Sequence, residues 1–142
     1  GHCIAVDPYF IVSAFPEDSI LIKSAREVNN KKNLWVKEKI MEKAKNFEFE
    51  NNRKPIIGCL GLSFKPNIDD LRESPALKIF NYLNESNFEV LACEPNLKKH
   101  SSIKLYSLKD IKSKADIIIK LVEHKEFKFQ KFPKKQFYDF CK

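Results

Sequence analysis

The sequence predicts an α/β fold in which a Rossmann-like, mainly parallel sheet forms three layers and is preceded by a long helix. Two patterns lead to this fold class. Apolar residues recur at helical spacing across residues 17–47, and after Pro55 short apolar runs alternate with helical patterns. The 142 residues are 43% hydrophobic and include 12 phenylalanines, which is enough to form the core of one domain.

The long helix is predicted over residues 17–47. Pro16 followed by Glu17 and Asp18 is typical of a helix start, and Asn29-Asn30 is a point where the helix could be interrupted. Its apolar stripe consists of Leu21, Ala25, Val28, Trp35, Ile40, Ala44 and Phe47. Because the short segment before it cannot cover such a helix, we expect the stripe to pack on the rest of the chain or on a second copy.

A polar segment, residues 46–54, is interpreted as a linker. It divides the chain into two predicted parts, residues 1–47 and residues 48–142. In the second part, the apolar runs 56–62, 88–93 and 116–122 are predicted strands, and residues 136–140 are a candidate fourth strand.

Two helices are predicted between these strands. Ser74-Pro75 supplies an N-cap and a first helical residue, followed by an apolar stripe. The pattern Ser107-x-x-Asp110 could cap a short second helix. Strands that alternate with helices in this way favour a parallel sheet covered on both faces.

The composition excludes several classes of protein. Only three glycines are present, and neither GxGxxG nor GxxxxGK[ST] occurs, so these residues contain no glycine-rich phosphate cradle. No apolar run approaches the roughly 18 residues of a membrane span. The first residues lack a basic region typical of a signal peptide, and we expect no membrane partner.

The net charge of +7 is concentrated near one end of the chain. Residues 96–142 contain 13 lysines, no arginine and 5 acidic residues. Because specific recognition of bases and phosphates favours arginine, a nucleic-acid partner is not expected, and a solvated lysine-rich face is the simpler interpretation.

The four cysteines, at positions 3, 59, 93 and 141, match neither a zinc pattern nor a CxxC pair. Cys59 and Cys93 fall inside predicted strands, where a buried free thiol is the common state. We therefore expect no metal and no structural disulfides, and a reducing compartment such as the cytoplasm.

Two segments are not explained by periodicity. In the first, Gly1 to Pro8, Cys3 and Asp7 could place a thiol and a carboxylate around one pocket. The alternatives are an inert cysteine and an ordinary Asp-Pro turn.

The second segment runs from Gly58 to Pro75, from a strand end through a charged loop to a helix start. In open α/β sheets ligands bind at this edge, and Lys65 and Arg72 add positive charge there. The alternative is a salt-bridge cluster of Asp69 or Asp70 with Arg72 that only shapes the loop.

Several motifs, taken together, resemble the UDP-glucose/GDP-mannose dehydrogenase family. They are GHCIAVDPYFIVS, AREVNN, LGLSFKPNIDDLRESPA, EPN and LVEHKEFK, in this order. Within the family, HCIAVDP favours the branch that acts on UDP-N-acetyl-D-mannosamine. Branches that act on UDP-N-acetylglucosamine or UDP-glucose are alternatives, as is a non-catalytic module that binds UDP-sugars or forms dimers.

The resemblance implies a reaction and a set of residues. Enzymes of this family oxidise C6 of a nucleotide sugar twice with NAD⁺, and this branch serves bacterial surface polysaccharide synthesis. Cys3 corresponds to the nucleophile that forms a thiohemiacetal and then a thioester, and Asp7 to an aspartate that assists it. Lys65 corresponds to a substrate contact with Phe64 beside it, unless Phe64 is simply core, and Arg72 to a contact with NAD.

The resemblance also implies what these residues lack. The family's N-terminal NAD-binding domain has no counterpart here, so we expect a C-terminal piece of a longer enzyme that does not turn over alone. Residues 55–142 would form the UDP-binding domain, and residues 9–47 would belong to the central domain that forms a homodimer. None of the histidines, His2, His100 and His124, receives a role.

Overall fold

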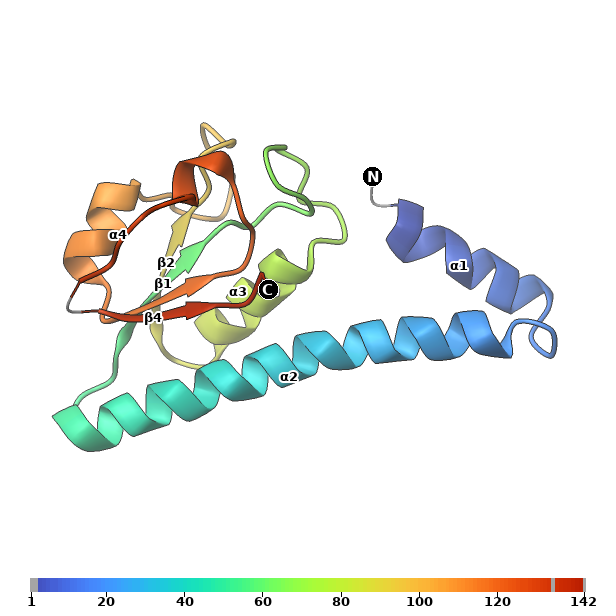
Figure 1. The fold of residues 1–142 in the computed structure, drawn as a ribbon, viewed down its shortest axis with the longest axis horizontal. Coiled ribbons are helices and arrows are strands. Elements are labelled where there is room, and N and C mark those ends of the chain that lie inside the picture. Colours follow the sequence, from blue (N-terminus) through green and yellow to red (C-terminus); the bar gives the residue numbers. More distant parts are fainter. Residues whose placement is uncertain (1–2, 134, 142) are drawn as a thin grey trace.

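The computed structural model describes residues 3–133 and 135–141. Two helices, α1 (Cys3–Ala14) and α2 (Ile20–Asn51), come first. Figure 1 shows α1 folded back along the first part of α2, so that the two helices form an arm that extends beyond the sheet domain. The second half of α2 runs beneath that domain.

The sheet contains β1 (Ile56–Leu60), β2 (Glu89–Cys93), β3 (Ile117–Lys120) and β4 (Gln136–Asp139). Their order is β2-β1-β3-β4, and every pair is parallel. The predicted α/β class and the candidate fourth strand are confirmed. Parallel neighbours need crossover connections, which the helices between the strands supply.

Helices cover both faces of the sheet, so the predicted three layers are also confirmed. On one face, α2 and α3 (Pro75–Glu85) pack on the sheet; on the other lie α4 (Leu108–Lys114) and the 3₁₀ turn η1 (Lys125–Phe127). The buried residues of α2 that join the first core are Val36, Ile40, Ala44 and Phe47. The long helix therefore packs on its own chain through its second half.

Helix α2 differs from the predicted helix at both ends. It begins at Ile20, after a turn, and it continues through Asn29-Asn30 without interruption. It also continues through Asn51, so most of the segment interpreted as a linker is helical. The prediction of a linker was wrong because Phe47 is buried and keeps the last turns of α2 against the sheet. The helix ends only where Asn52 takes a left-handed conformation (φ 53°).

The true connection, residues 52–55, is held by an ion pair. The guanidinium of Arg53 donates to both carboxylate oxygens of Asp116 at 2.8 Å, and Asp116 also accepts the Ile56 N–H at 2.9 Å. This bidentate pair holds the start of β1 beside the start of β3.

The segment around Cys3 is helical, so the Asp-Pro turn, one of the alternatives for this segment, is not formed. Helix α1 continues through Pro8, whose missing N–H leaves the Ile4 carbonyl without its helical partner. None of the residues of α1 is buried, so the helix rests on α2 with an open outer face.

Both predicted helix caps are confirmed. The Ser74 hydroxyl accepts the Leu77 N–H at 3.2 Å, with Pro75 as the first residue of α3. Ser107 and Asp110 form a complete capping box at the start of α4.

Candidate functional site

The carboxyl ends of β1, β2 and β3 meet at one edge of the sheet, where ligands bind in open α/β folds. The loop of residues 61–74, here called the β1–α3 loop, leaves β1 at this edge. It carries Phe64, Lys65 and Arg72, three of the predicted site residues.

Hydrogen bonds within the β1–α3 loop give it a fixed shape. The Phe64 N–H donates to the Asp70 carbonyl at 2.8 Å and closes a turn, and the Ser63 hydroxyl donates to the Lys65 carbonyl at 2.7 Å. Ser74 anchors the end of the loop by donating to the Leu62 carbonyl at 2.7 Å. The loop is therefore an ordered platform for its exposed side chains.

Beneath this platform lies a buried polar cluster formed by Glu94 and His124. One carboxylate oxygen of Glu94 accepts the N–H groups of Leu62 and Ser63 at 2.7 and 3.0 Å and lies 3.0 Å from Nε2 of His124. Its other oxygen accepts the Asn96 N–H at 3.1 Å. Glu94 is 3% exposed and His124 is 0% exposed, so solvent does not compete for these bonds.

Burial pushes the pKa of Glu94 up, but the hydrogen bonds from His124 and from the N–H groups of Leu62 and Asn96 outweigh that effect. The pKa of Glu94 consequently lies below its ordinary value, and the carboxylate is ionised at neutral pH. A buried negative charge thus ties the ends of three strands together.

Sequence reasoning gave His124 no role, and Glu94 entered only as part of the EPN motif. A signal was present: Glu94 directly follows the strand 89–93, and His124 comes four residues after the end of the strand 117–120. Polar residues at the carboxyl ends of adjacent parallel strands converge, and that rule would have brought these two together.

The cluster contains Ser63, His124 and Glu94, the residue types of a hydrolytic triad, but its geometry is different. The Ser63 hydroxyl (3.3 Å) and the Glu94 carboxylate both face the same ring nitrogen, Nε2. A triad needs the carboxylate on one nitrogen and the nucleophile on the other. Ser63 is also 1% exposed, so no substrate could reach it.

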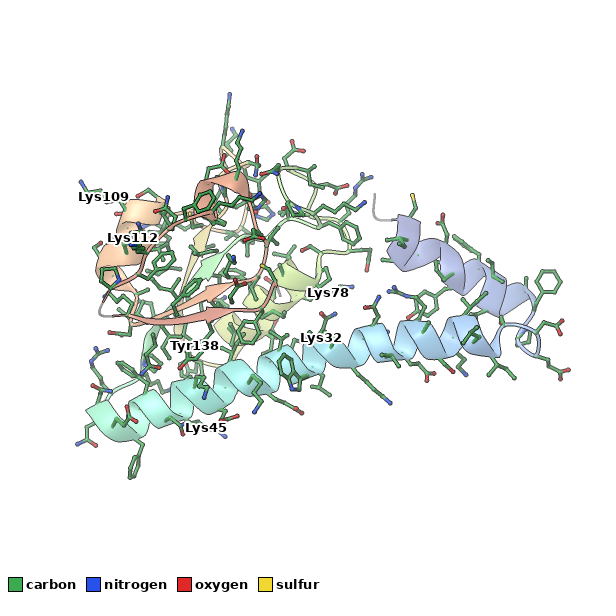
Figure 2. All side chains as sticks on the ribbon, viewed as in Figure 1. Lys32, Lys45, Lys78, Lys109, Lys112 and Tyr138 are labelled. Carbon is green, nitrogen blue, oxygen red and sulfur yellow. The ribbon has the colours of Figure 1, made fainter. Side chains whose placement is uncertain are left out.

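A cavity of about 350 Å³ opens between the helical arm and the β1–α3 loop. That size is at the lower end for small-molecule sites. Its lining combines apolar groups with amides and cations: Ile4, Ala5, Arg26, Asn29, Asn30, Lys32, Asn33, Phe64, Glu73, Pro75 and Lys78. The wall of the cavity includes Lys32 on α2 and Lys78 on α3, both labelled in Figure 2.

Arg26 lies on the arm side of the cavity. Its guanidinium is 5.7 Å from the centre of the Tyr9 ring, and among the described residues its buried Nε has no hydrogen-bond partner. Arg26 adds positive charge to the cavity wall, which would attract an anionic group bound there.

The structure brings some of the predicted site residues together at this cavity and leaves others outside. Phe64 lines it, which favours the binding interpretation over a simple core role. Lys65 is exposed, with its ammonium 6.0 Å from the Phe64 ring centre, outside the cavity wall. Cys3 directly precedes two lining residues, Ile4 and Ala5, and Asp7 lies one helical turn further on the same exposed face of α1.

Arg72 forms the intraloop ion pair that was the alternative interpretation. Its guanidinium donates to the two carboxylate oxygens of Asp70 at 3.0 and 2.8 Å. The hydrogen bond and the charge of Asp70 raise the pKa of Arg72, and Cys3 makes a smaller electrostatic contribution. Arg72 thus shapes the loop and also lies within electrostatic range of the Cys3 sulfur.

A buried cation lies at the end of β3. Lys120 is 6% exposed, and its ammonium pairs with Glu123 at 2.8 Å and Asp139 at 2.9 Å. Burial alone would lower the pKa of Lys120, but these two carboxylates raise it above its ordinary value. The bond to Asp139 joins β3 to β4, and the bond to Glu123 holds the segment that follows β3.

In the described part of the chain, no helix is both long and apolar enough to cross a membrane. Within the same residues, no group of three or more histidine, cysteine or acidic side chains could hold a metal ion. All four cysteines are free thiols, with Cys59 and Cys93 buried as expected.

A fully parallel sheet with an ordered, charged loop at its carboxyl edge is typical of α/β domains that bind a ligand at this edge. Comparison with known proteins agrees with that class. Residues 58–140 match the UDP binding domain of the UDP-glucose/GDP-mannose dehydrogenase family. The chain belongs to this family.

Relatives with curated names share much of the sequence. A UDP-N-acetyl-D-mannosamine dehydrogenase from Campylobacter jejuni is 47% identical over 135 residues, covering 89% of this chain and 32% of the relative. An NDP-N-acetyl-D-galactosaminuronic acid dehydrogenase from Ralstonia solanacearum is 44% identical over 133 residues, covering 90% and 30%. The chain thus spans about a third of the length of these relatives.

A solved structure is similar over nearly the whole chain. The UDP-N-acetyl-mannosamine dehydrogenase Cap5O from S. aureus has a TM-score of 0.75 and 28% identity, covering 98% of this chain and 37% of that one. The likeness includes the helical arm as well as the sheet domain.

Proposed function

We propose that the chain is the C-terminal part of an NAD-dependent enzyme that oxidises C6 of a UDP-sugar, with UDP-N-acetyl-D-mannosamine as the substrate. The observation that carries this proposal is the match of residues 58–140 to a UDP binding domain, next to a cavity rich in cations. The relative named as an NDP-N-acetyl-D-galactosaminuronic acid dehydrogenase favours a second candidate function, which is the oxidation of another UDP-hexosamine. The free cysteines fit a cytoplasmic enzyme of bacterial polysaccharide synthesis.

In this proposal the β1–α3 loop binds the nucleotide sugar. The Lys65 side chain is exposed and can donate to a substrate oxygen, and the Phe64 ring forms one wall of the cavity. The ordered loop means that little conformational entropy is lost when the ligand binds.

Cys3 acts as the nucleophile and Asp7 assists it. A thiolate adds readily to an aldehyde carbon, and the thioester formed after the second oxidation is then hydrolysed. Both side chains are exposed on the face of α1 whose first turn borders the cavity.

NAD, as the hydride acceptor, does not fit the residues of this chain by themselves. The sequence has no glycine-rich cradle, and Arg72, the residue expected to contact NAD, already pairs with Asp70. We therefore expect these residues to contribute at most one contact to NAD and to show no turnover alone.

Replacing Lys65 with methionine tests the substrate site. We expect the dissociation constant for UDP-N-acetyl-D-mannosamine to rise about tenfold, because a hydrogen bond from a charged donor is worth about 1.5 kcal/mol or more. Lys45→Met is the matched control, since Lys45 is an exposed lysine on the far side of α2 (Figure 2). Equal affinities of the two variants, measured by calorimetry, would remove Lys65 from the site.

Thiol labelling tests the nucleophile. Burial, with Asp139 beside it, raises the pKa of Cys141 to about 12, so at pH 8 only about one Cys141 side chain in 10,000 is a thiolate. Cys3 is exposed, whereas the Cys141 thiol is partly buried and donates to the Lys120 carbonyl, so Cys141 serves as the slow internal reference. We expect iodoacetamide to modify Cys3 at least about 100-fold faster than Cys141, as followed by peptide mass spectrometry.

The Cys3→Ser variant is the control for this experiment, because it should lose the fast phase and keep the slow one. Modification of Cys141 as fast as Cys3 would count against an activated thiol at position 3.

We also propose that the chain forms a homodimer through the arm. Large apolar side chains on α1, on the connection after it and on the first half of α2 are exposed: Ile4, Phe10, Ile11, Phe15, Ile20, Leu21, Val28 and Leu34. An apolar surface of this extent is typical of an interface. Trp35 belongs to it only in part, because its ring also packs edge-on against Phe140 at 6.2 Å.

Leu21→Lys is a cleaner test of the dimer than a change at Trp35, since Leu21 is 82% exposed. We expect the dimer dissociation constant to rise roughly tenfold or more in sedimentation experiments, as for a typical central interface residue. Phe49→Lys, at an 89% exposed position near the other end of α2, should leave association unchanged. A dimer unaffected by Leu21→Lys would place the interface elsewhere.

A further inference from the structure

His124 lies under the β1–α3 loop and contacts it directly. We propose that His124 is a positioning residue, whose Nδ1 atom holds the Asn67 N–H and thereby fixes the turn that presents Phe64 and Lys65. The role in ligand binding rests on the proposed function, because only there do these two side chains meet a nucleotide sugar.

The hydrogen-bond donors around the His124 ring indicate which ring nitrogen carries the proton. The Asn67 N–H can only donate, and it lies 2.8 Å from Nδ1; the Asn96 side-chain amide lies 2.9 Å from the same atom. Nδ1 therefore carries a lone pair, and the proton is on Nε2, which faces the Glu94 carboxylate at 3.0 Å. Ionised Glu94 stabilises this tautomer of a neutral imidazole.

Asn67 is the residue through which the bond to His124 Nδ1 fixes the shape of the β1–α3 loop. Its backbone is left-handed (φ 62°), and its side-chain oxygen accepts the Lys125 N–H at 2.9 Å. The hydrogen bonds of Asn67 to His124 and Lys125 thus attach the tip of the turn to the segment that follows β3. Within the described residues the Asn67 N–H donates to His124 Nδ1, so loss of Nδ1 would leave the Lys125 bond to hold the tip.

The alternative to a positioning role is that the His124 ring only fills space in the protein interior. Its ring is fully buried and packs edge-on against Phe127, with the ring centres 5.5 Å apart. Two substitutions separate the two roles. Glutamine is closer to histidine in volume and can donate toward Glu94, but it has no acceptor at the position of Nδ1. Asparagine is smaller, yet its amide oxygen can take the place of Nδ1.

Amide hydrogen exchange of the whole chain measures the turn directly. We expect the N–H groups of Asn67 and Phe64 to exchange about tenfold faster in His124→Gln, while His124→Asn stays close to wild type. The N–H of Cys59 in β1 should be unchanged in both variants. The dissociation constant for UDP-N-acetyl-D-mannosamine should follow the same order, rising about tenfold only in His124→Gln.

His100→Gln is the matched control. His100 also accepts a backbone N–H at Nδ1, from Ser102 at 3.2 Å, but it does so in a separate loop. Neither exchange at Asn67 nor ligand affinity should change in this variant.

Two results would overturn the proposal. One is exchange at Asn67 that is equally fast in His124→Asn and His124→Gln, or faster in the asparagine variant. The other is a proton on Nδ1 of His124 in the ¹⁵N spectrum of the wild-type chain, a measurement that needs no variant to fold. If the wild-type chain binds no UDP-sugar, the proposed function fails, and the exchange pattern still decides the positioning role.

Discussion

The Glu94→Ala variant is expected to lose about 4 kcal/mol of unfolding free energy at pH 7, the cost of breaking a buried, charged hydrogen-bond cluster. The carboxylate accepts the N–H groups of Leu62 and Ser63 and faces His124, and alanine leaves all of these buried donors without an acceptor. Urea unfolding followed by circular dichroism measures the loss.

Glu89→Ala is the control, because Glu89 is the exposed first residue of β2, the strand that Glu94 directly follows. Its unfolding free energy should stay within about 0.5 kcal/mol of wild type. Similar losses in the two variants would mean that the cluster contributes little to stability.

The pH dependence of stability tests the same charge. The pKa of Glu94 is lower in the folded chain than in the unfolded chain, so its contribution is fully present above the unfolded value of about 4.3. It is then lost as the pH falls through the folded pKa. We expect the wild type to lose stability over this acidic range, and Glu94→Gln to show a smaller loss there.

The Gly61→Ala variant is expected to lose about 3 kcal/mol of unfolding free energy. Gly61 has φ 86°, which costs an alanine about 1–2 kcal/mol, and the added Cβ would lie 2.5 Å from Cβ and 2.9 Å from the carbonyl oxygen of Val122. The backbone after β3 would have to move, and with it the start of the β1–α3 loop. Thermal and urea unfolding provide the measurement.

Gly58→Ala is the comparison for this prediction. Its Cβ would meet only side-chain atoms, at 2.6 Å from Cγ2 of Ile111 and 3.0 Å from Cβ of Ala115, and its backbone φ is not left-handed. A smaller loss is therefore expected at Gly58. A loss at Gly61 no larger than at Gly58 would contradict the importance of the left-handed backbone.

Local patterns in the sequence predicted the sheet domain well. Apolar runs of strand length and the caps at Ser74 and Ser107 depend on neighbouring residues only, and the structure confirms them. Helix α1 was missed because Asp7-Pro8 is typical of a turn, while contacts such as that of Tyr9 with Asn30 on α2, at 3.0 Å, support a helix. Contacts between distant residues decided the structure there.

The candidate site was predicted only in part, because some of its contacts join residues that are far apart in the sequence. The β1–α3 loop was recognised from its motif and its place at a strand end, and Phe64 does line a cavity. The pairing of Arg72 with Asp70, two residues away, was one of two interpretations of the sequence. The contact of Glu94 with His124 joins residues 30 positions apart, and only the register of β1, β2 and β3 brings them together.

The central claim is that this chain contains a UDP-binding domain of a nucleotide-sugar dehydrogenase. Calorimetric titration of the 142-residue chain with UDP, and separately with NAD⁺, tests it most directly. We expect one UDP to bind per chain with a dissociation constant of about 1 mM or lower, and NAD⁺ to bind at least about tenfold more weakly. Absence of UDP binding, or tighter binding of NAD⁺ than of UDP, would contradict the account.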